Sequence, residues 1–303
     1  GSTAGIGLAI ARRFAQEGAD VVLVGRAEDK LRHVEEALVG LGGGGVQAVL
    51  ANVATAEGAE ALARQVPDVD ILVNNLGIYE SKDFADITDE DWRRFFEVNV
   101  LSGARLARRY LPGMLQRDWG RIVFIASDSG LIIPPDMIHY GMTKTAQLSI
   151  SRGLAGLTKG SRVTVNAVLP GTTRSEGIED FLKSVASDPA APMSEIEAEF
   201  FARDRPTSLI QRMIEPEEVA ALVVDLANQL NLHKSTLHGL LNTLAAMGYV
   251  TRHGTRYALG QRLREVAQPL ADSDVTLRTE FTPALQMLAK QSGDSSRWRS
   301  PVA

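Results

Sequence analysis

Short apolar runs rich in β-branched residues alternate with segments of helical periodicity through the first 227 residues. Five runs have the length and composition of buried strands: 21–24, 46–50, 69–73, 121–126 and 162–169. Strands that are apolar on both faces are typical of parallel sheets, because helices then cover both sides. The segments between them, such as 8–17 and 28–38, place apolar residues on one helical face. This alternation predicts an α/β fold, a Rossmann-like doubly wound parallel sheet.

A serine and a Tyr/Lys pair follow the fourth of these runs. Ser127 ends the run, and ligands of open α/β sheets bind at the carboxyl ends of the strands. Tyr140 and Lys144 stand four residues apart in a helical segment, so they share one helical face. An ammonium group there would lower the pKa of a phenol from about 10, while Ser127 could hydrogen-bond a carbonyl oxygen. The alternative is an ordinary helix pair, with the Lys stem lying along apolar surface.

The chain opens on a glycine cluster, Gly1-Ser-Thr-Ala-Gly5-Ile-Gly7, directly ahead of a predicted helix. Such glycines allow a tight turn and leave the first helical amides free to hold a pyrophosphate. Gly25 and Arg26 follow the first predicted strand. In a dinucleotide site an acidic residue at this place binds a ribose hydroxyl of NAD, whereas an arginine accommodates the 2′-phosphate of NADP. Because the chain has an arginine and no carboxylate here, NADP is favoured over NAD. A plain glycine loop and a solvated arginine remain the alternative.

The composition excludes several kinds of site. The 303 residues include no cysteine, so a disulfide framework and a thiolate metal site are both excluded, and we expect no metal. Neither an apolar run of transmembrane length nor a cleavable signal is present, so we expect a cytoplasmic protein without a membrane partner. The net charge is -5, yet residues 228–303 carry nine Lys or Arg against five Asp or Glu. This uneven charge indicates two modules with different partners.

Polar residues at the ends of the other predicted strands complete a pattern. Asn74-Asn-Leu-Gly77 follows one strand, Pro170-Gly171-Thr172-Thr173 follows another, and Asn99 lies in a helical pair between them. Together with the glycine cluster, Ser127 and Tyr140-Gly-Met-Thr-Lys144, these motifs make residues 1–227 resemble the short-chain dehydrogenase/reductase family. The resemblance implies hydride transfer between NADP, or less readily NAD, and the carbonyl or alcohol carbon of a small molecule. It also implies a homo-oligomer.

The resemblance assigns a role to each motif. Tyr140 is the general acid/base, Lys144 lowers its pKa and binds the nicotinamide ribose, Ser127 orients the substrate oxygen, and Asn99 supports a proton relay through water. The implied cofactor-binding residues are Gly1, Ser2, Thr3, Gly5, Ile6, Gly7, Arg26, Asn52, Val53, Asn75, Leu76, Gly77, Tyr140, Lys144, Pro170, Gly171, Thr172 and Thr173. Residues 174–213, with Phe181, Phe200 and Phe201, take the place of the family's substrate lid.

The sequence departs from the family pattern inside and at both ends of the domain. Leu76 replaces the usual alanine, and Asn52 replaces an aspartate that lies near the adenine. The family's first strand is missing before Gly1, and its last strand is missing after the predicted helix 215–227. Because the first strand is central in such a sheet, we expect unpaired backbone beside strands 21–24 and 71–73, and hence a poor enzyme.

Residues 225–264 resemble the winged helix-turn-helix of IclR-type transcription regulators. The resemblance implies that Lys234, Ser235, Thr236 and His238 begin a recognition helix in the major groove, and that Arg252 and Arg256 contact phosphates from the wing. Residues 265–303 resemble only the start of the regulator's effector domain. We therefore predict three parts: an oxidoreductase domain, 1–227; a winged-helix segment, 228–264; and a truncated effector segment, 265–303. The alternative for the second part is a helical appendage that does not bind DNA.

Three hypotheses about function follow. The first is an NADP-preferring oxidoreductase that acts on a small carbonyl or alcohol substrate. The second is a DNA-binding regulator whose sheet domain senses a ligand. The third is a fusion fragment in which neither activity is intact.

Overall fold

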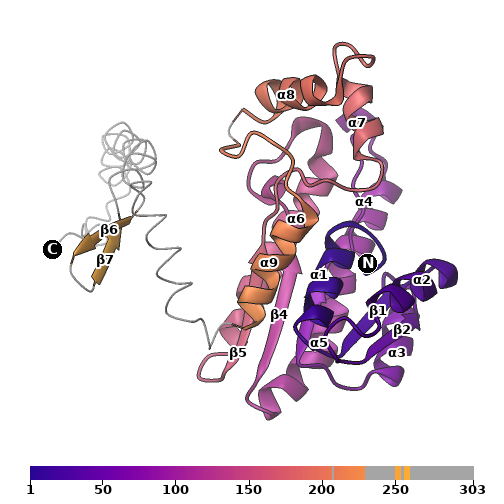
Figure 1. The fold of residues 1–303 in the computed structure, drawn as a ribbon, viewed down its shortest axis with the longest axis vertical. Helices are drawn as coiled ribbons and strands as arrows, with labels where there is room; N and C mark the ends of the chain where they lie inside the picture. Colours follow the sequence, from indigo (N-terminus) through magenta and orange to yellow (C-terminus); the bar gives the residue numbers. More distant parts are fainter. Residues whose placement is uncertain (207, 229–249, 254–255, 260–303) are drawn as a thin grey trace, which may run out of the picture. The chain divides into compact units, whose positions relative to one another are not determined.

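The strands of the first unit, Gly1–Gln229, form two parallel sheets. In this computed structural model the described residues are 1–206, 208–228, 250–253 and 256–259. Strand β1 (Val21–Gly25) pairs with β2 (Val46–Leu50). Strand β4 (Gly120–Ile125) lies between β3 (Ile71–Asn74) and β5 (Val163–Val168). The predicted parallel α/β arrangement is confirmed (Figure 1).

Helices connect these strands and cover both faces of the sheets. Their bounds are α1 Gly5–Gln16, α2 Glu28–Leu38, α3 Ala56–Gln65, α4 Asp89–Phe96, α5 Ser102–Gln116, α6 Ile138–Leu157, α7 Ile178–Val185, α8 Met193–Asp204 and α9 Pro216–Ala227. Helix α4 begins at a capping box, in which Thr88 and Asp91 bond each other's backbone amides. Such reciprocal bonds satisfy two amides that the helix itself leaves unpaired. Among the described helices, none is both long and apolar enough to cross a membrane.

The side chains of β4 alternate between two hydrophobic clusters. Ile122 and Phe124 pack with α3 and α5, whereas Val123 and Ile125 pack with α1 and α9. Figure 1 shows α1 and α9 running side by side next to β4. Because both faces of β4 are covered, its sequence is apolar at nearly every position. This is the layering expected of a doubly wound sheet.

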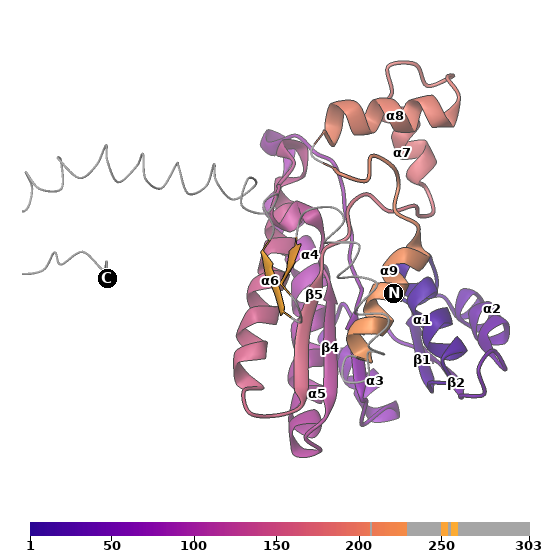
Figure 2. The same ribbon diagram turned by 60° about the vertical axis from the view of Figure 1, so that its left-hand side comes forward.

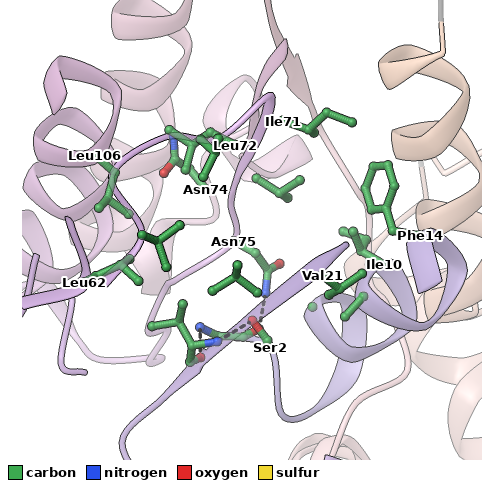
Figure 3. A pocket seen from close by; sticks show the side chains of 18 of the residues that line it. Ser2, Ile10, Phe14, Val21, Leu62, Ile71, Leu72, Asn74, Asn75 and Leu106 are labelled. Carbon is green, nitrogen blue, oxygen red and sulfur yellow. Dashed lines mark hydrogen bonds between the residues drawn. The ribbon is translucent and has the colours of Figure 1, made fainter. Parts of the chain in front are cut away.

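A cavity of about 670 Å³ separates the two sheets. Its walls include β1 and β3, and no described strand pairs with either of them on the side that faces the cavity. Figure 3 shows Ile10 and Phe14 from α1 and Leu62 and Leu106 from α3 and α5 around this space. The backbone edges of two parallel strands therefore border a cavity with both apolar and polar side chains in its walls.

The cavity also contains an unsatisfied polar side chain. Asn74, at the end of β3, is only 6% exposed, and neither its amide nitrogen nor its carbonyl oxygen has a hydrogen-bond partner in the described part of the chain. Nearby, Asn75 donates a hydrogen bond to the backbone oxygen of Gly1 (2.9 Å), as Figure 3 shows. A buried amide without partners costs stability, so Asn74 indicates that a polar group is needed in this cavity.

The second unit, residues 230–303, is described only at its predicted hairpin. Strands β6 (Val250–His253) and β7 (Arg256–Leu259) are antiparallel, with Arg252 opposite Tyr257. The hairpin agrees with the predicted wing. The predicted recognition helix and the truncated effector segment, 265–303, lie outside the described residues, so the three-part division remains a prediction.

Candidate active site

The carboxyl ends of the strands meet at a second cavity, of about 280 Å³. Ser127 follows β4, while Tyr140 and Lys144 project into the same cavity from α6. The segment after β5 adds four more predicted residues to the wall: Pro170, Gly171, Thr172 and Thr173. The structure thus brings together three of the four predicted catalytic side chains.

The hydroxyl of Ser127 is held by the turn that follows β4. It accepts a hydrogen bond from the amide of Ser129 (3.1 Å) and donates one to Oδ1 of Asp128 (3.0 Å). A hydrogen bond from the amide of Asp128 to the backbone oxygen of Pro170 (3.0 Å) holds the main chain of this turn in place. Because Ser127 has one proton, a carbonyl oxygen bound here would compete with Asp128 for it.

The pKa of Tyr140 is raised to about 12, first by burial and against the opposing effect of a hydrogen bond with Ser127. Lys144 is not among the causes of this shift, so the predicted lowering of the pKa of Tyr140 by Lys144 stays a prediction. The Nζ atom of Lys144 lies 5.5 Å from the centroid of the Tyr140 ring and donates to the oxygen of Ile125 (3.0 Å). Burial also lowers the pKa of Lys144, to about 8. At neutral pH the phenol therefore carries its proton.

Asn99 lies in a π-helical turn, Glu97–Leu101, between α4 and α5. Its side chain forms three hydrogen bonds: the oxygen accepts from the amide of Ile78 (2.7 Å), and the nitrogen donates to the oxygen of Ile78 (2.9 Å) and to Thr143 (3.0 Å). These bonds tie the loop after β3 to α6. Asn99 thereby fixes the wall that carries Gly77, and its oxygen keeps one lone pair that could still accept a bond from a water. The predicted proton relay stays a prediction.

Sequence reasoning missed Gln147, which stands next to Lys144 in the structure. Gln147 is 2% exposed, its oxygen lies 3.4 Å from Nζ of Lys144, and its nitrogen donates to the backbone oxygen of Asn99 (2.6 Å). The sequence could have indicated Gln147, because it is a polar residue at a core position of a helix, one turn after Lys144. Gln147 thus connects Lys144 to the backbone oxygen of Asn99, and not to the Asn99 side chain.

The glycine turn has the shape that a pyrophosphate requires. Gly5 has a φ of +51°, and a Cβ on Gly7 would lie 1.8 Å from the oxygen of Gly1. The N-cap of α1, Ala4, forms no side-chain hydrogen bond, so no side chain occupies the first amides of the helix. Free amides at a helix N-terminus bind phosphate groups. The residues present therefore fit a dinucleotide phosphate.

Arg26 lies beside this turn. Arg26 is exposed at the end of β1. Ser2 joins the turn to the same strand, because its hydroxyl accepts a hydrogen bond from the amide of Val24 (3.2 Å).

The structure does not bring all the predicted cofactor residues to one cavity. Ile6, Asn75 and Gly77 line the cavity of Tyr140, whereas Val53 and Leu76 line the cavity between the sheets. The remaining predicted residues are placed as follows: Gly1 and Ser2 also line the cavity between the sheets, Thr3 lies where a Cβ on Gly25 would approach it to 3.3 Å, and Asn52 is exposed after β2.

Helices α7 and α8 lie within residues 174–213, the segment predicted to be a substrate lid. Figures 1 and 2 show them together beyond one end of the strands. Phe200 and Phe201 pack edge to face in a hydrophobic cluster of the lid itself, with ring centroids 5.5 Å apart. Phe181 and Phe200 also line the cavity of Tyr140, while Phe201 is buried inside the lid. The lid therefore supplies apolar walls to the candidate site.

Of the predicted DNA-contacting residues, Arg252 and Arg256 belong to the hairpin strands β6 and β7. The other four, Lys234, Ser235, Thr236 and His238, lie outside the described residues.

Comparison with known proteins identifies this arrangement. The family model described as short chain dehydrogenase matches residues 1–184. The uncharacterized oxidoreductase YvaG of Bacillus subtilis is 48% identical over 235 residues, which cover 76% of this chain and 88% of YvaG. A D-beta-hydroxybutyrate dehydrogenase of Rhizobium meliloti is 34% identical over 75% of this chain and 89% of its own length. The chain belongs to the short-chain dehydrogenase/reductase family of oxidoreductases.

A solved structure supports the same assignment. L-sorbose reductase from Gluconobacter frateurii, complexed with NADPH and L-sorbose, superposes with a TM-score of 0.69 at 32% identity. The match covers 75% of this chain and 87% of the reductase.

A second family model, described as the IclR helix-turn-helix domain, matches residues 215–254. The first part of that match is α9, whose Val219, Ala220 and Val223 are buried against α1 and β4. In this structure α9 therefore belongs to the core of the oxidoreductase unit.

Proposed function

We propose that this chain is an NADP-preferring oxidoreductase that interconverts a small carbonyl compound and its alcohol. The observation that carries the proposal is the cavity in which Ser127, Tyr140 and Lys144 lie together at the carboxyl ends of β4 and β5. A bound nicotinamide supplies or accepts the hydride. The residues of the chain bind the substrate oxygen and move its proton.

Tyr140 is the proton donor in the reducing direction. Its raised pKa keeps the phenol protonated at neutral pH, and a protonated phenol can donate to the oxygen of a carbonyl that accepts a hydride. The hydroxyl of Ser127 positions the same oxygen. The buried ammonium of Lys144 offers donors to the ribose hydroxyls of the cofactor, and Asn99 holds the loop of Gly77 in place.

The glycine turn and Arg26 support the choice of cofactor. The free amides at the start of α1 suit the pyrophosphate, and the guanidinium of Arg26 suits a 2′-phosphate. The similar L-sorbose reductase is a complex with NADPH. Gly25, at the position where NAD sites often place a carboxylate, has no side chain.

The test replaces Tyr140 by Phe, which removes the proton and keeps the ring. NADPH oxidation with a panel of ketones and aldehydes should fall by at least about a hundredfold, the usual range for loss of a general acid. The matched control is Tyr79→Phe, because Tyr79 lines the same cavity with its ring 6.5 Å from that of Tyr140. A Tyr140→Phe variant that keeps the parent rate on a substrate the parent reduces would refute the assignment.

DNA binding is a second candidate function, favoured by the match to the IclR helix-turn-helix domain and by the β6–β7 hairpin. Arginines at 252 and 256 would meet phosphates, and binding would weaken steeply with salt because condensed counterions are released. Gel retardation of a random-sequence duplex pool by the whole chain, at several salt concentrations, tests this candidate. Absence of any salt-sensitive retardation would leave the segment without a role in DNA binding.

We also propose that an extended apolar segment completes the sheet between β1 and β3. The two strand edges that face one cavity and the unsatisfied amide of Asn74 support this proposal. As partners we propose a small-molecule substrate and further copies of this chain.

A further inference from the structure

One arginine, Arg205, lines the candidate active-site cavity. It follows α8 and shares the cavity with Ser127 and Tyr140. Its guanidinium carbon lies 5.5 Å from the centroid of the Phe200 ring, and Nη1 donates to the backbone oxygen of Asp204 (2.8 Å). Arg205 is half-buried. Packing against an aromatic ring and a bond to the main chain hold this cation at the wall of the cavity.

Arg205 differs from the other arginines of the lid region in its charge partners. Arg174 pairs with Glu197 and Glu215, Arg203 with Glu199 and Asp204, and Arg212 with Glu218. Within the described part of the chain, Arg205 pairs with no carboxylate. A guanidinium has five N–H donors in a planar fork that matches a carboxylate or phosphate. Its single side-chain bond leaves most of these donors available.

A negative charge lies near the reacting end of the cavity. Asp128 follows Ser127 directly, and its Oδ1 accepts from Ser127 and Ser129. Its Oδ2 has no hydrogen bond among the described residues and lies 3.6 Å from the place where a Cβ on Gly171 would stand. An anionic group attached directly to the reacting carbonyl would be repelled by this carboxylate.

We propose that Arg205 binds an anionic group of the substrate, a carboxylate or a phosphate, that at least one carbon atom separates from the reacting carbonyl. The proposal rests on the proposed oxidoreductase function and names the class of its substrate. Arg205 recognises the charged end, and Asp128 disfavours substrates in which the charge adjoins the carbonyl.

The experiment compares 3-oxobutanoate with its neutral analogue 3-oxobutanamide, using the whole chain. Two quantities are measured for each compound: kcat/KM with NADPH, and the affinity for the NADP⁺-bound protein by calorimetry, which requires no turnover. The parent should prefer the acid by about tenfold, the size expected of one charge-assisted contact. Arg205→Gln should remove this preference. Arg203→Gln, which removes an equal charge from a neighbouring arginine outside the cavity lining, should retain it.

Three results would overturn the proposal. They are a parent without preference for the acid, an Arg205→Gln variant that retains the preference, and an Arg203→Gln variant that loses it equally. Weaker NADPH binding in Arg205→Gln with the acid preference unchanged would show instead that Arg205 binds a cofactor phosphate. A larger acid-over-amide preference for 2-oxobutanoate than for 3-oxobutanoate would contradict the part given to Asp128. If no carbonyl is reduced, the proposed function fails, and the calorimetric comparison still decides the role of Arg205.

Discussion

The side-chain oxygen of Gln147 lies 3.4 Å from the ammonium nitrogen of Lys144, one turn along α6. The nitrogen of the same amide donates to the backbone oxygen of Asn99, 2.6 Å away in the π-helical turn. Gln147 therefore connects the buried lysine to the turn that positions Gly77. Since burial lowers the pKa of Lys144 to about 8, a change in this one neighbour should change the pH at which the lysine loses its charge.

We predict opposite effects for two replacements of Gln147. Gln147→Glu places a negative charge beside Lys144 and should raise its pKa, whereas Gln147→Met removes an acceptor and should lower it further. In the parent, NADPH affinity should decline as the pH rises through about 8, and this midpoint should move up in the first variant and down in the second. The measurement is the dissociation constant of NADPH between pH 6 and about 10, the normal lysine range.

Gln65→Glu is the control, because it adds the same charge at an exposed position at the end of α3. Its midpoint should match that of the parent. Variants of Gln147 that lower the melting temperature and leave the midpoint in place would show that this residue only packs.

His139 should make the stability of the fold depend on pH, and this effect can be measured without an assay of activity. It is fully buried, both ring nitrogens lack partners among the residues that the structure describes, and the centre of its ring lies 4.1 Å from that of Phe95. Burial lowers its pKa in the folded chain. Below a pH of about 6.5 the histidine therefore binds a proton in the unfolded chain but not in the folded chain. As the pH drops from there toward the pKa of the folded state, the free energy of unfolding should fall by up to about 1.4 kcal/mol per pH unit.

His139→Leu should accordingly lose less of its melting temperature than the parent between pH 7 and pH 5, about the range in which an ordinary histidine titrates. His33→Leu, which replaces an exposed histidine on α2, should behave as the parent does. Parallel losses in the parent and in His139→Leu would show that other groups account for the acid sensitivity.

Arg26→Gln tests the cofactor preference. Loss of one charge-assisted contact should reduce the NADPH-to-NADH ratio of kcat/KM by about tenfold. Gly25→Asp is unsuitable as an added change, because a Cβ at residue 25 would lie 3.1 Å from Leu31 and 3.3 Å from Thr3. Arg13→Gln, at a surface ion pair with Glu17, serves as the charge-matched control. An unchanged ratio in Arg26→Gln would remove this residue from the cofactor site.

The strands and the helix of Tyr140 could be predicted because their evidence is local. The β-branched runs mark buried strands, and the spacing of Tyr140 and Lys144 follows from helical geometry alone. Gln147 and Arg205 could not be predicted in this way. Their partners, Asn99 and the cavity wall, come from distant parts of the chain, so only the packed structure brings them together.

The balance between burial and the nearby lysine at Tyr140 could not be predicted, for a related reason. A sequence shows the lysine four residues away, but it does not show how far each group is buried. In the structure burial has the larger effect and raises the pKa of the phenol, while it lowers that of the lysine. The sequence also did not indicate the π-helical turn at Asn99, whose side chain bonds Ile78 and Thr143 from other parts of the chain.

The last prediction concerns the cavity between the sheets. β1 and β3 each leave one edge without a strand partner among the described residues, and apolar side chains such as Ile10, Phe14 and Leu62 form part of the walls between them. An extension of about five apolar residues ahead of Gly1 would reach this space, because Gly1 and Ser2 already bond the oxygen of Val24 beside it. The added strand would run parallel to both neighbours, with helices above and below.

Each backbone group that gains a partner removes a penalty of about 1–3 kcal/mol, so several together are comparable to the stability of a whole domain, about 5–15 kcal/mol. The extended chain should therefore melt higher than the chain from Gly1. It should also bind NADPH more tightly, because the strand fixes the glycine turn. An extension of equal length made of Gly and Ser controls for the added residues, since it has no apolar side chains to bury. If the apolar and the Gly/Ser extensions give the same melting temperature and the same NADPH affinity, the cavity does not accept a strand, and the unsatisfied amide of Asn74 requires another explanation.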